Sequence, residues 1–131
     1  MLKNFTILND IDYNLLIDNY GNFEINLIKD NNDIIPITLP LSESIKLFTE
    51  DTSQNYLSSN NYDFLKDTSL IKDFNNNDIF LRPTNTLFRN YDIIIGSKNL
   101  ETPLEYNIYS RNYFYMLNES VEITLCPPNN Y

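Results

Sequence analysis

Histidine is absent from this 131-residue sequence, and cysteine occurs only once, at Cys126. Without histidine, the common Ser–His–acid and Cys–His catalytic arrangements cannot be built within the chain. A lone cysteine also excludes an internal disulfide framework and a cysteine-based zinc cluster. We therefore expect no catalytic residue, no metal site, no cofactor and no enzymatic activity. Because a free cysteine usually behaves as a small hydrophobe, we expect Cys126 to be buried at a strand end rather than to be a spare surface thiol.

The sequence also lacks an apolar run of about eighteen residues, the length at which a membrane-spanning helix is suspected. No basic segment followed by an apolar one opens the chain, so a secretory signal is not expected either. The expectation is a soluble protein that starts at Met1. With 42% hydrophobic residues, the chain can bury one core, and we expect a single domain over residues 1–131.

Basic residues are scarce: nine Lys and Arg stand against eighteen Asp and Glu, which gives a net charge of -9. Such a charge repels nucleic-acid backbones and anionic membranes, and it favours solubility or a basic partner. We therefore expect no direct binding to nucleic acid and no contact with a membrane.

Alanine is missing and valine occurs only at Val121, whereas asparagine is unusually common. The codons for Ala, Val and Gly begin with G, while those for Asn, Ile, Tyr, Phe and Lys are rich in A and T. The composition therefore indicates a strongly AT-rich genome, as many viruses, phages, clostridia and protists have.

The stretch NDIDYNLLIDNYGNFEINLI, residues 9–28, begins like a calcium-binding loop. Asp10, Asp12 and Asn14 supply side-chain oxygens at its first, third and fifth positions. Such a loop also requires glycine at the sixth position and a bidentate glutamate at the twelfth. Here those positions hold Leu15 and Gly21, so we expect no calcium site.

The same stretch fits a β-hairpin over residues 12–28. A three-residue loop at 19–21 would place Gly21 in the left-handed conformation that such loops need. The resulting register puts apolar residues opposite one another on one face: Ile17 with Phe23, Leu15 with Ile25, and Tyr13 with Leu27. We therefore predict two antiparallel strands joined by a tight turn.

A helical and loop-rich middle is predicted over residues 42–75. Before it, residues 34–40 are β-rich but contain two prolines that cannot donate to a ladder, which indicates an edge strand or an extended connection. A short helix is predicted at 42–49 behind a cap from Ser42. Its apolar stripe comprises Leu41, Ile45 and Phe48. Residues 50–61 are expected to form a loop.

A second helix is predicted at about 62–74, ended by the asparagine triplet at 75–77. The rest of the chain, residues 78–126, resembles a series of short strands with alternating apolar residues. The expected strands are 79–82, 86–89, 92–95, 104–110, 113–117 and 121–126. We therefore predict a mainly β (β-rich α+β) fold, whose C-terminal half is an antiparallel meander, sandwich or barrel-like sheet with one wetted face.

Aromatic residues gather around an arginine in the segment 104–117. Tyr and Arg are the side chains that protein interfaces favour, because a rigid ring with a polar tip provides contact area at a small loss of entropy. The interface candidates are Tyr106, Tyr109, Arg111, Tyr113 and Tyr115. The alternative is an ordinary half-buried sheet face, and the sequence does not separate the two.

These observations favour a non-enzymatic structural protein that binds other proteins, or further copies of itself, in a larger assembly. The leading hypothesis is a minor virion component of an AT-rich virus or phage, such as a capsid decoration, connector or tail-associated subunit, found in the virion or the host cytoplasm. One alternative is an acidic inhibitor that mimics nucleic acid and blocks a host or defence enzyme. Another is an accessory subunit of a bacterial toxin complex.

Overall fold

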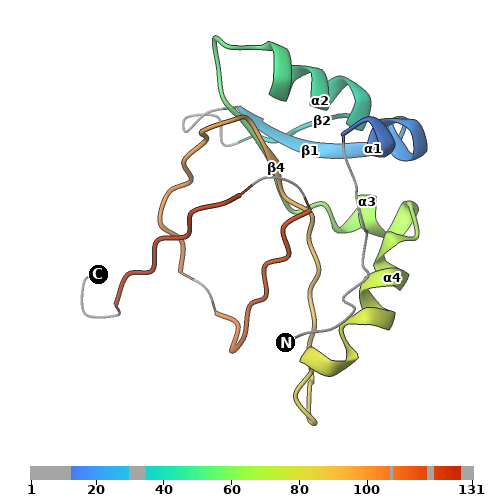
Figure 1. Cartoon of the computed structure of the whole chain (residues 1–131), viewed down its shortest axis with the longest axis vertical. Coiled ribbons are helices and arrows are strands. Elements are labelled where there is room, and N and C mark those ends of the chain that lie inside the picture. The colour runs from blue at the N-terminus through green and yellow to red at the C-terminus, as the bar shows by residue number, and fades with distance from the viewer. Residues whose placement is uncertain (1–12, 30–34, 107, 118–119, 128–131) are drawn as a thin grey trace.

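The computed structural model describes residues 13–29, 35–106, 108–117 and 120–127 (Figure 1). The described helices are α1 (Tyr13–Tyr20), α2 (Leu41–Glu50), α3 (Tyr62–Asp67), α4 (Leu70–Asn77) and the 3-10 turn η1 (Ile79–Leu81). The described strands are β1 (Glu24–Lys29), β2 (Ile37–Pro40), β3 (Tyr56–Ser58) and β4 (Ile95–Gly96). With 32% of the described residues in helices and 14% in a small four-stranded antiparallel sheet, the fold is mixed α+β. The prediction of a mainly β fold is wrong.

The first half of the predicted hairpin is a helix. Tyr13, Leu16, Ile17 and Tyr20 recur at intervals of three and four residues, which places them on one side of α1, where Leu16 is buried and the others pack against the core. The strand prediction used the alternation of Tyr13, Leu15 and Ile17 instead, but Leu15 is 44% exposed. Both periods fit this short stretch, and packing decides between them. The predicted cross-strand pairs therefore do not form.

Gly21 follows α1, but it does not adopt the predicted left-handed conformation. Its N–H donates to the carbonyl oxygen of Ile17 at 2.9 Å, and its own carbonyl accepts from the N–H of Ser42 at 3.0 Å. A Cβ atom on Gly21 would lie 2.5 Å from the Ile17 oxygen. Glycine is therefore required here because backbone approaches it closely, and not because of its φ angle.

The four strands lie in the order β2-β1-β3-β4, and all neighbours are antiparallel. Ile25 and Leu27 of β1 face Leu39 and Ile37 of β2, which confirms an edge strand within residues 35–40. Strand β3 lies within residues 50–61, which were predicted to form a loop. It comprises only three residues, too few to give a strand pattern in the sequence. Asp10 and Asp12, which begin the calcium-loop pattern that the sequence analysis rejected, lie outside the described part of the chain.

The predicted helix at 42–49 is confirmed as α2, and its stripe of Leu41, Ile45 and Phe48 is buried. The predicted cap is wrong: the residue before the helix is Pro40, and no side chain caps it. The hydroxyl of Ser44 donates instead to the Pro40 carbonyl at 3.0 Å.

The predicted helix at 62–74 is present as α3 and α4, which are separated by Thr68 and Ser69. Ser69 has a φ of 63°, a left-handed conformation that breaks the helix and turns the chain. The asparagine triplet at 75–77 was predicted to follow the helix and end it, but it forms the last turn of α4.

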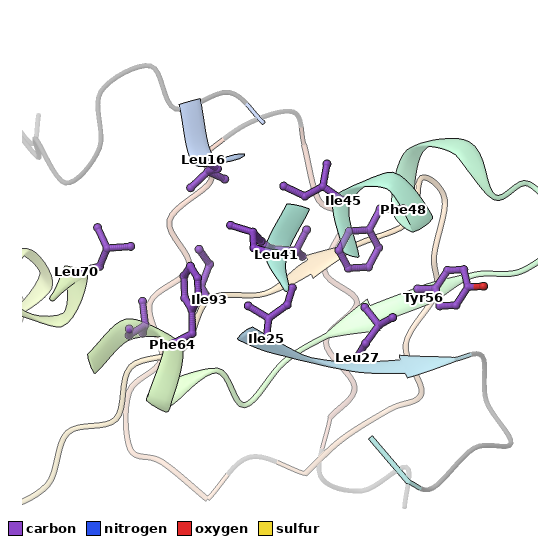
Figure 2. Close-up of a cluster of buried hydrophobic side chains, with 12 residues drawn as sticks. Leu16, Ile25, Leu27, Leu41, Ile45, Phe48, Tyr56, Phe64, Leu70 and Ile93 are labelled. Atoms are coloured by element: carbon purple, nitrogen blue, oxygen red, sulfur yellow. The ribbon is translucent and has the colours of Figure 1, made fainter. Parts of the chain in front are cut away.

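The core lies between one face of the sheet and the helices. In Figure 2, Leu41, Ile45 and Phe48 of α2 lie over Ile25 and Leu27 of β1. The buried cluster comprises Leu16, Ile25, Leu27, Leu41, Ile45, Phe48, Tyr56, Phe64, Leu65, Leu70, Ile93 and Ile95. All of these residues precede residue 97, so the C-terminal third of the chain adds none of the fully buried apolar residues among those described.

The predicted C-terminal meander does not form. Among the described residues of 78–127, only Ile95 and Gly96 are in a strand, and 79–81 form a 3-10 turn. A turn at 97–100 reverses the chain after β4, with the Leu100 N–H donating to the Ser97 carbonyl at 3.2 Å. Continued as a hairpin, that turn would set Pro103 opposite Ile94, where proline offers no N–H to the ladder. No strand is assigned among the described residues of the segments predicted at 79–82, 86–89, 104–110, 113–117 and 121–126, so those predictions are wrong, and of 92–95 only Ile95 lies in a strand.

Candidate functional site

A buried polar network surrounds Asn61, whose exposed fraction is 1%. Its side-chain amide donates to the Ser58 hydroxyl and to the Ile93 carbonyl, both at 2.8 Å, and its side-chain oxygen accepts from the N–H of Asn26 at 2.9 Å. The carboxylate of Asp92 accepts from the Asn61 N–H at 2.7 Å. Every polar atom of this side chain has a protein partner, so the network joins β1, β3, the start of α3 and the approach to β4 rather than binding a ligand.

A second polar cluster surrounds Asp78 at the end of α4. Its carboxylate accepts from the Tyr91 hydroxyl and from Arg82 Nε, each at 2.6 Å. Arg89 donates to the Asn75 side chain at 3.0 Å and to the Tyr91 hydroxyl at 3.1 Å. Both guanidinium groups are thus held by neighbours, which indicates that the cluster fixes this turn of the chain.

Two shallow pockets lie beside these polar groups. One, of about 290 Å³, is lined by Tyr62, Ile71, Asn75, Leu87, Phe88, Arg89 and Tyr91. The other, of about 340 Å³, is lined by Glu24, Asn26, Thr38, Asn61, Asp63, Phe64, Lys66 and Asp67. Within the described ranges, no group of three or more acidic or thiol side chains is arranged to hold a metal ion.

The shifted pKa values of Asp51, Tyr56 and Tyr91 leave these three side chains unsuited to proton transfer at neutral pH. Hydrogen bonds from the hydroxyls of Ser53 and Tyr56 lower the pKa of Asp51 to about 2. The bond to Asp51 raises the pKa of Tyr56, and burial followed by the bond to Asp78 raises the pKa of Tyr91. A general acid or base works best with a pKa near the working pH. The shifts move the pKa of the aspartate further below neutrality and the pKa values of the two tyrosines further above it.

The most unusual surface is the described part of residues 104–126, which we call the C-terminal apolar segment. It is extended, and no helix or strand is assigned within its described residues. Figure 1 shows it as a wide loop that leaves the body of the fold and returns to it before residues 120–127 run away from the sheet, and Leu117 within it packs against the core. Its exposed large apolar residues are Leu104, Tyr106, Ile108, Tyr109, Tyr113, Phe114, Tyr115, Met116, Val121, Ile123 and Leu125.

All five predicted interface residues lie on this segment and are exposed, Arg111 included. Contacts with the body of the fold include the ring of Tyr109, which stacks on Phe88 with centroids 6.1 Å apart, and the Tyr113 hydroxyl, which donates to the Leu81 carbonyl at 3.0 Å. Because the expected strands are absent, the paired-strand arrangement predicted around Arg111 is not present. The interface role itself stays a prediction.

The aliphatic residues of the segment were not predicted to be exposed. The alternation of Val121, Ile123 and Leu125 was interpreted as one buried face of a strand, yet Leu125 is 87% exposed. Cys126, predicted to be buried, is an exposed free cysteine. The available signal was the proline at 103, which interrupts the ladder that would have covered them.

Comparison with protein-family models, with curated proteins and with solved structures finds no match for this chain. None of the helices in the described ranges is both long enough and apolar enough to span a membrane.

Proposed function

We propose that this protein is a structural subunit of a larger protein assembly and that it binds its neighbours through the C-terminal apolar segment. The observation that supports the proposal is the exposure of that segment, from 40% at Tyr115 to 87% at Leu125. Contiguous exposed apolar surface beyond a few hundred Å² marks an interaction site in soluble proteins.

The size of the exposed surface fits a protein partner. The five aromatic residues of the segment are 40–76% exposed, and an aromatic side chain contributes about 150–250 Å² when fully exposed, so these rings alone expose roughly 400–700 Å². A stable interface of ordinary size buries about 800 Å² on each partner. With its six other exposed apolar residues added, the segment offers surface on the scale of one side of such an interface.

The kind of assembly is inferred from composition. The AT-driven residue usage fits a virus or phage, the absence of histidine removes the common histidine-based catalytic arrangements, and a net charge of -9 disfavours contact with nucleic acid. A minor virion component, such as a decoration, connector or tail-associated subunit, combines these properties. Mass spectrometry of purified native particles from the source virus is expected to detect this chain, and its absence would exclude a virion role.

The Arg111→Ala, Tyr113→Ala double variant is expected to weaken binding to the assembly by about 2 kcal/mol or more, the scale of an interface hot spot. Both side chains are exposed, so the isolated fold should be retained. Circular dichroism and co-sedimentation with native particles, on the same sample, provide the measurement.

The matched control replaces Tyr62 and Lys98 by alanine, an exposed tyrosine and an exposed cation outside the segment. This control is expected to co-sediment like the wild type. If the Arg111, Tyr113 variant unfolds, the bond from the Tyr113 hydroxyl to the Leu81 carbonyl supports the fold, and Arg111→Ala alone then tests binding. If it folds and co-sediments normally, the segment has no role in binding through these two side chains.

A further inference from the structure

The two edges of the sheet differ in their ability to accept another strand. On the β2 edge, the Leu41 N–H donates to the Phe23 carbonyl at 2.8 Å, which fixes the odd-numbered residues as those bonded to β1. The backbone groups of Pro36, Thr38 and Pro40 then point outward. Proline has no N–H, so Thr38 is the one outward donor of residues 36–40, and this edge is protected against strand addition.

Among the residues that the structure describes, nothing gives the β4 edge such protection. The Ser97 N–H donates to the Tyr56 carbonyl at 2.9 Å, and Ile95 pairs with Ser58 in the same ladder. The alternating pattern of an antiparallel pair therefore turns the N–H and C=O groups of Ile94 and Gly96 away from β3. The bond from the Asn61 side chain to the Ile93 carbonyl supports this orientation. In a trans peptide unit the C=O and N–H groups point in opposite directions, so the N–H of Ile94 points away from Asn61 and β3.

This edge is also free of prolines, since none occurs between Pro83 and Pro103. The hairpin that would cover it from within the chain is interrupted at Pro103, as described above. An open edge of this kind is a template for a strand from another segment.

A strand of suitable length and pattern occurs at the end of the C-terminal apolar segment. Residues 121–126 read Val-Glu-Ile-Thr-Leu-Cys, with apolar and polar residues alternating and with high β-propensity. The segment contains no proline or glycine and stops at Pro127. It is exposed, and Figure 1 shows residues 120–127 running away from β4 of their own chain.

We infer that residues 121–126 of one copy add as a strand to the β4 edge of a second copy. In this arrangement Val121, Ile123 and Leu125 extend the apolar row that Ile93 and Ile95 begin on the core face of the sheet. The inference rests on the proposed function, because it names the partner of the same segment as a second copy of this chain.

Reciprocal exchange between two copies would cover both donor strands and both open edges at once. The apolar residues that it would bury on each donor strand, Val121, Ile123 and Leu125, are 49–87% exposed in the single copy. The exchange also makes each copy both donor and acceptor, so the pair closes on itself as a two-fold dimer.

The test uses Cys126, the single and exposed cysteine, as the position for a spin label. Spin-labelled chain is mixed with ¹⁵N-labelled Cys126→Ser chain, so that broadening of the ¹⁵N amide signals arises only between copies. Broadening is expected at residues 92–96 and is not expected at β2. Sedimentation of the unlabelled full chain gives the dissociation constant of the dimer.

Three variants separate the β4 edge from general effects. Ile94→Pro removes an outward N–H without removing a bond to β3, and it is expected to raise the dissociation constant about tenfold or more, as loss of a ladder bond and of strand fit implies. Ile94→Thr keeps that N–H and is expected to dimerise. Thr38→Pro removes the one outward donor of the β2 edge and is also expected to dimerise.

Ile123→Pro, on the exposed donor strand, provides a second test that leaves the core untouched, and it is expected to weaken the dimer like Ile94→Pro. A chain that stays monomeric at high concentration would overturn the inference, as would broadening at β2 or equal dimerisation of all variants. In those cases, co-sedimentation with native particles that still depends on Arg111 and Tyr113 would leave the proposed function standing.

Discussion

Replacement of Asn61 by alanine is expected to lower the free energy of unfolding by about 3–4 kcal/mol, because it leaves several buried polar groups without partners. The N–H of Asn26, the hydroxyl of Ser58 and the carbonyl of Ile93 each lose the atom that they bond. These groups lie on three different segments, and the side chain that joins them is 1% exposed.

Urea denaturation monitored by circular dichroism measures this change. Asn76→Ala is the matched control, since Asn76 is an exposed asparagine of α4. It is expected to change stability by less than about 0.5 kcal/mol. If the two variants were equally stable, the Asn61 network would not hold the sheet to α3.

Gly21→Ala is expected to cost about 2–3 kcal/mol, because the new methyl group is forced against backbone that cannot move freely. The Cβ position lies 2.5 Å from the Ile17 carbonyl oxygen and 3.3 Å from Ser42 Cβ. Relief of this contact would separate the end of α1 from the start of α2, which Gly21 joins through its two backbone hydrogen bonds.

Gly96→Ala is the control for this prediction. A Cβ there would meet Leu100 Cδ2 at 3.0 Å, the far end of a flexible side chain, so a cost below about 1 kcal/mol is expected. Thermal unfolding of the two variants under the same conditions gives the comparison. A Gly21→Ala protein as stable as Gly96→Ala would mean that the Ile17 carbonyl does not approach Gly21 as closely as described.

The sequence predicted those elements whose apolar period has a single interpretation. Leu41, Ile45 and Phe48 fit a helix and not a strand, and α2 was located to within a residue or two. The two prolines of residues 35–40 restricted that segment to an edge, where β2 lies. Elements with these features follow from local chemistry alone.

The failures have physical causes that a local pattern does not contain. The residues of α1 satisfy a strand period and a helix period at once, and burial of Leu16 against the core selects the helix. The polar contacts of Asn61 join segments more than thirty residues apart, and nothing in the local pattern marks that residue among the many asparagines. Strand propensity at 121–126 is genuine, but a strand forms only where an open edge accepts it.

Hydrogen–deuterium exchange, followed by mass spectrometry, tests most directly whether the C-terminal apolar segment is a contact surface. In dilute isolated chain, amides of the segment are expected to exchange rapidly, while those of β1 and β3 are protected and serve as the internal reference. In native particles, or at concentrations where the chain self-associates, the segment is expected to become protected while the reference strands change little. Protection already present in the dilute monomer, or rapid exchange that persists in the assembly, would contradict the account.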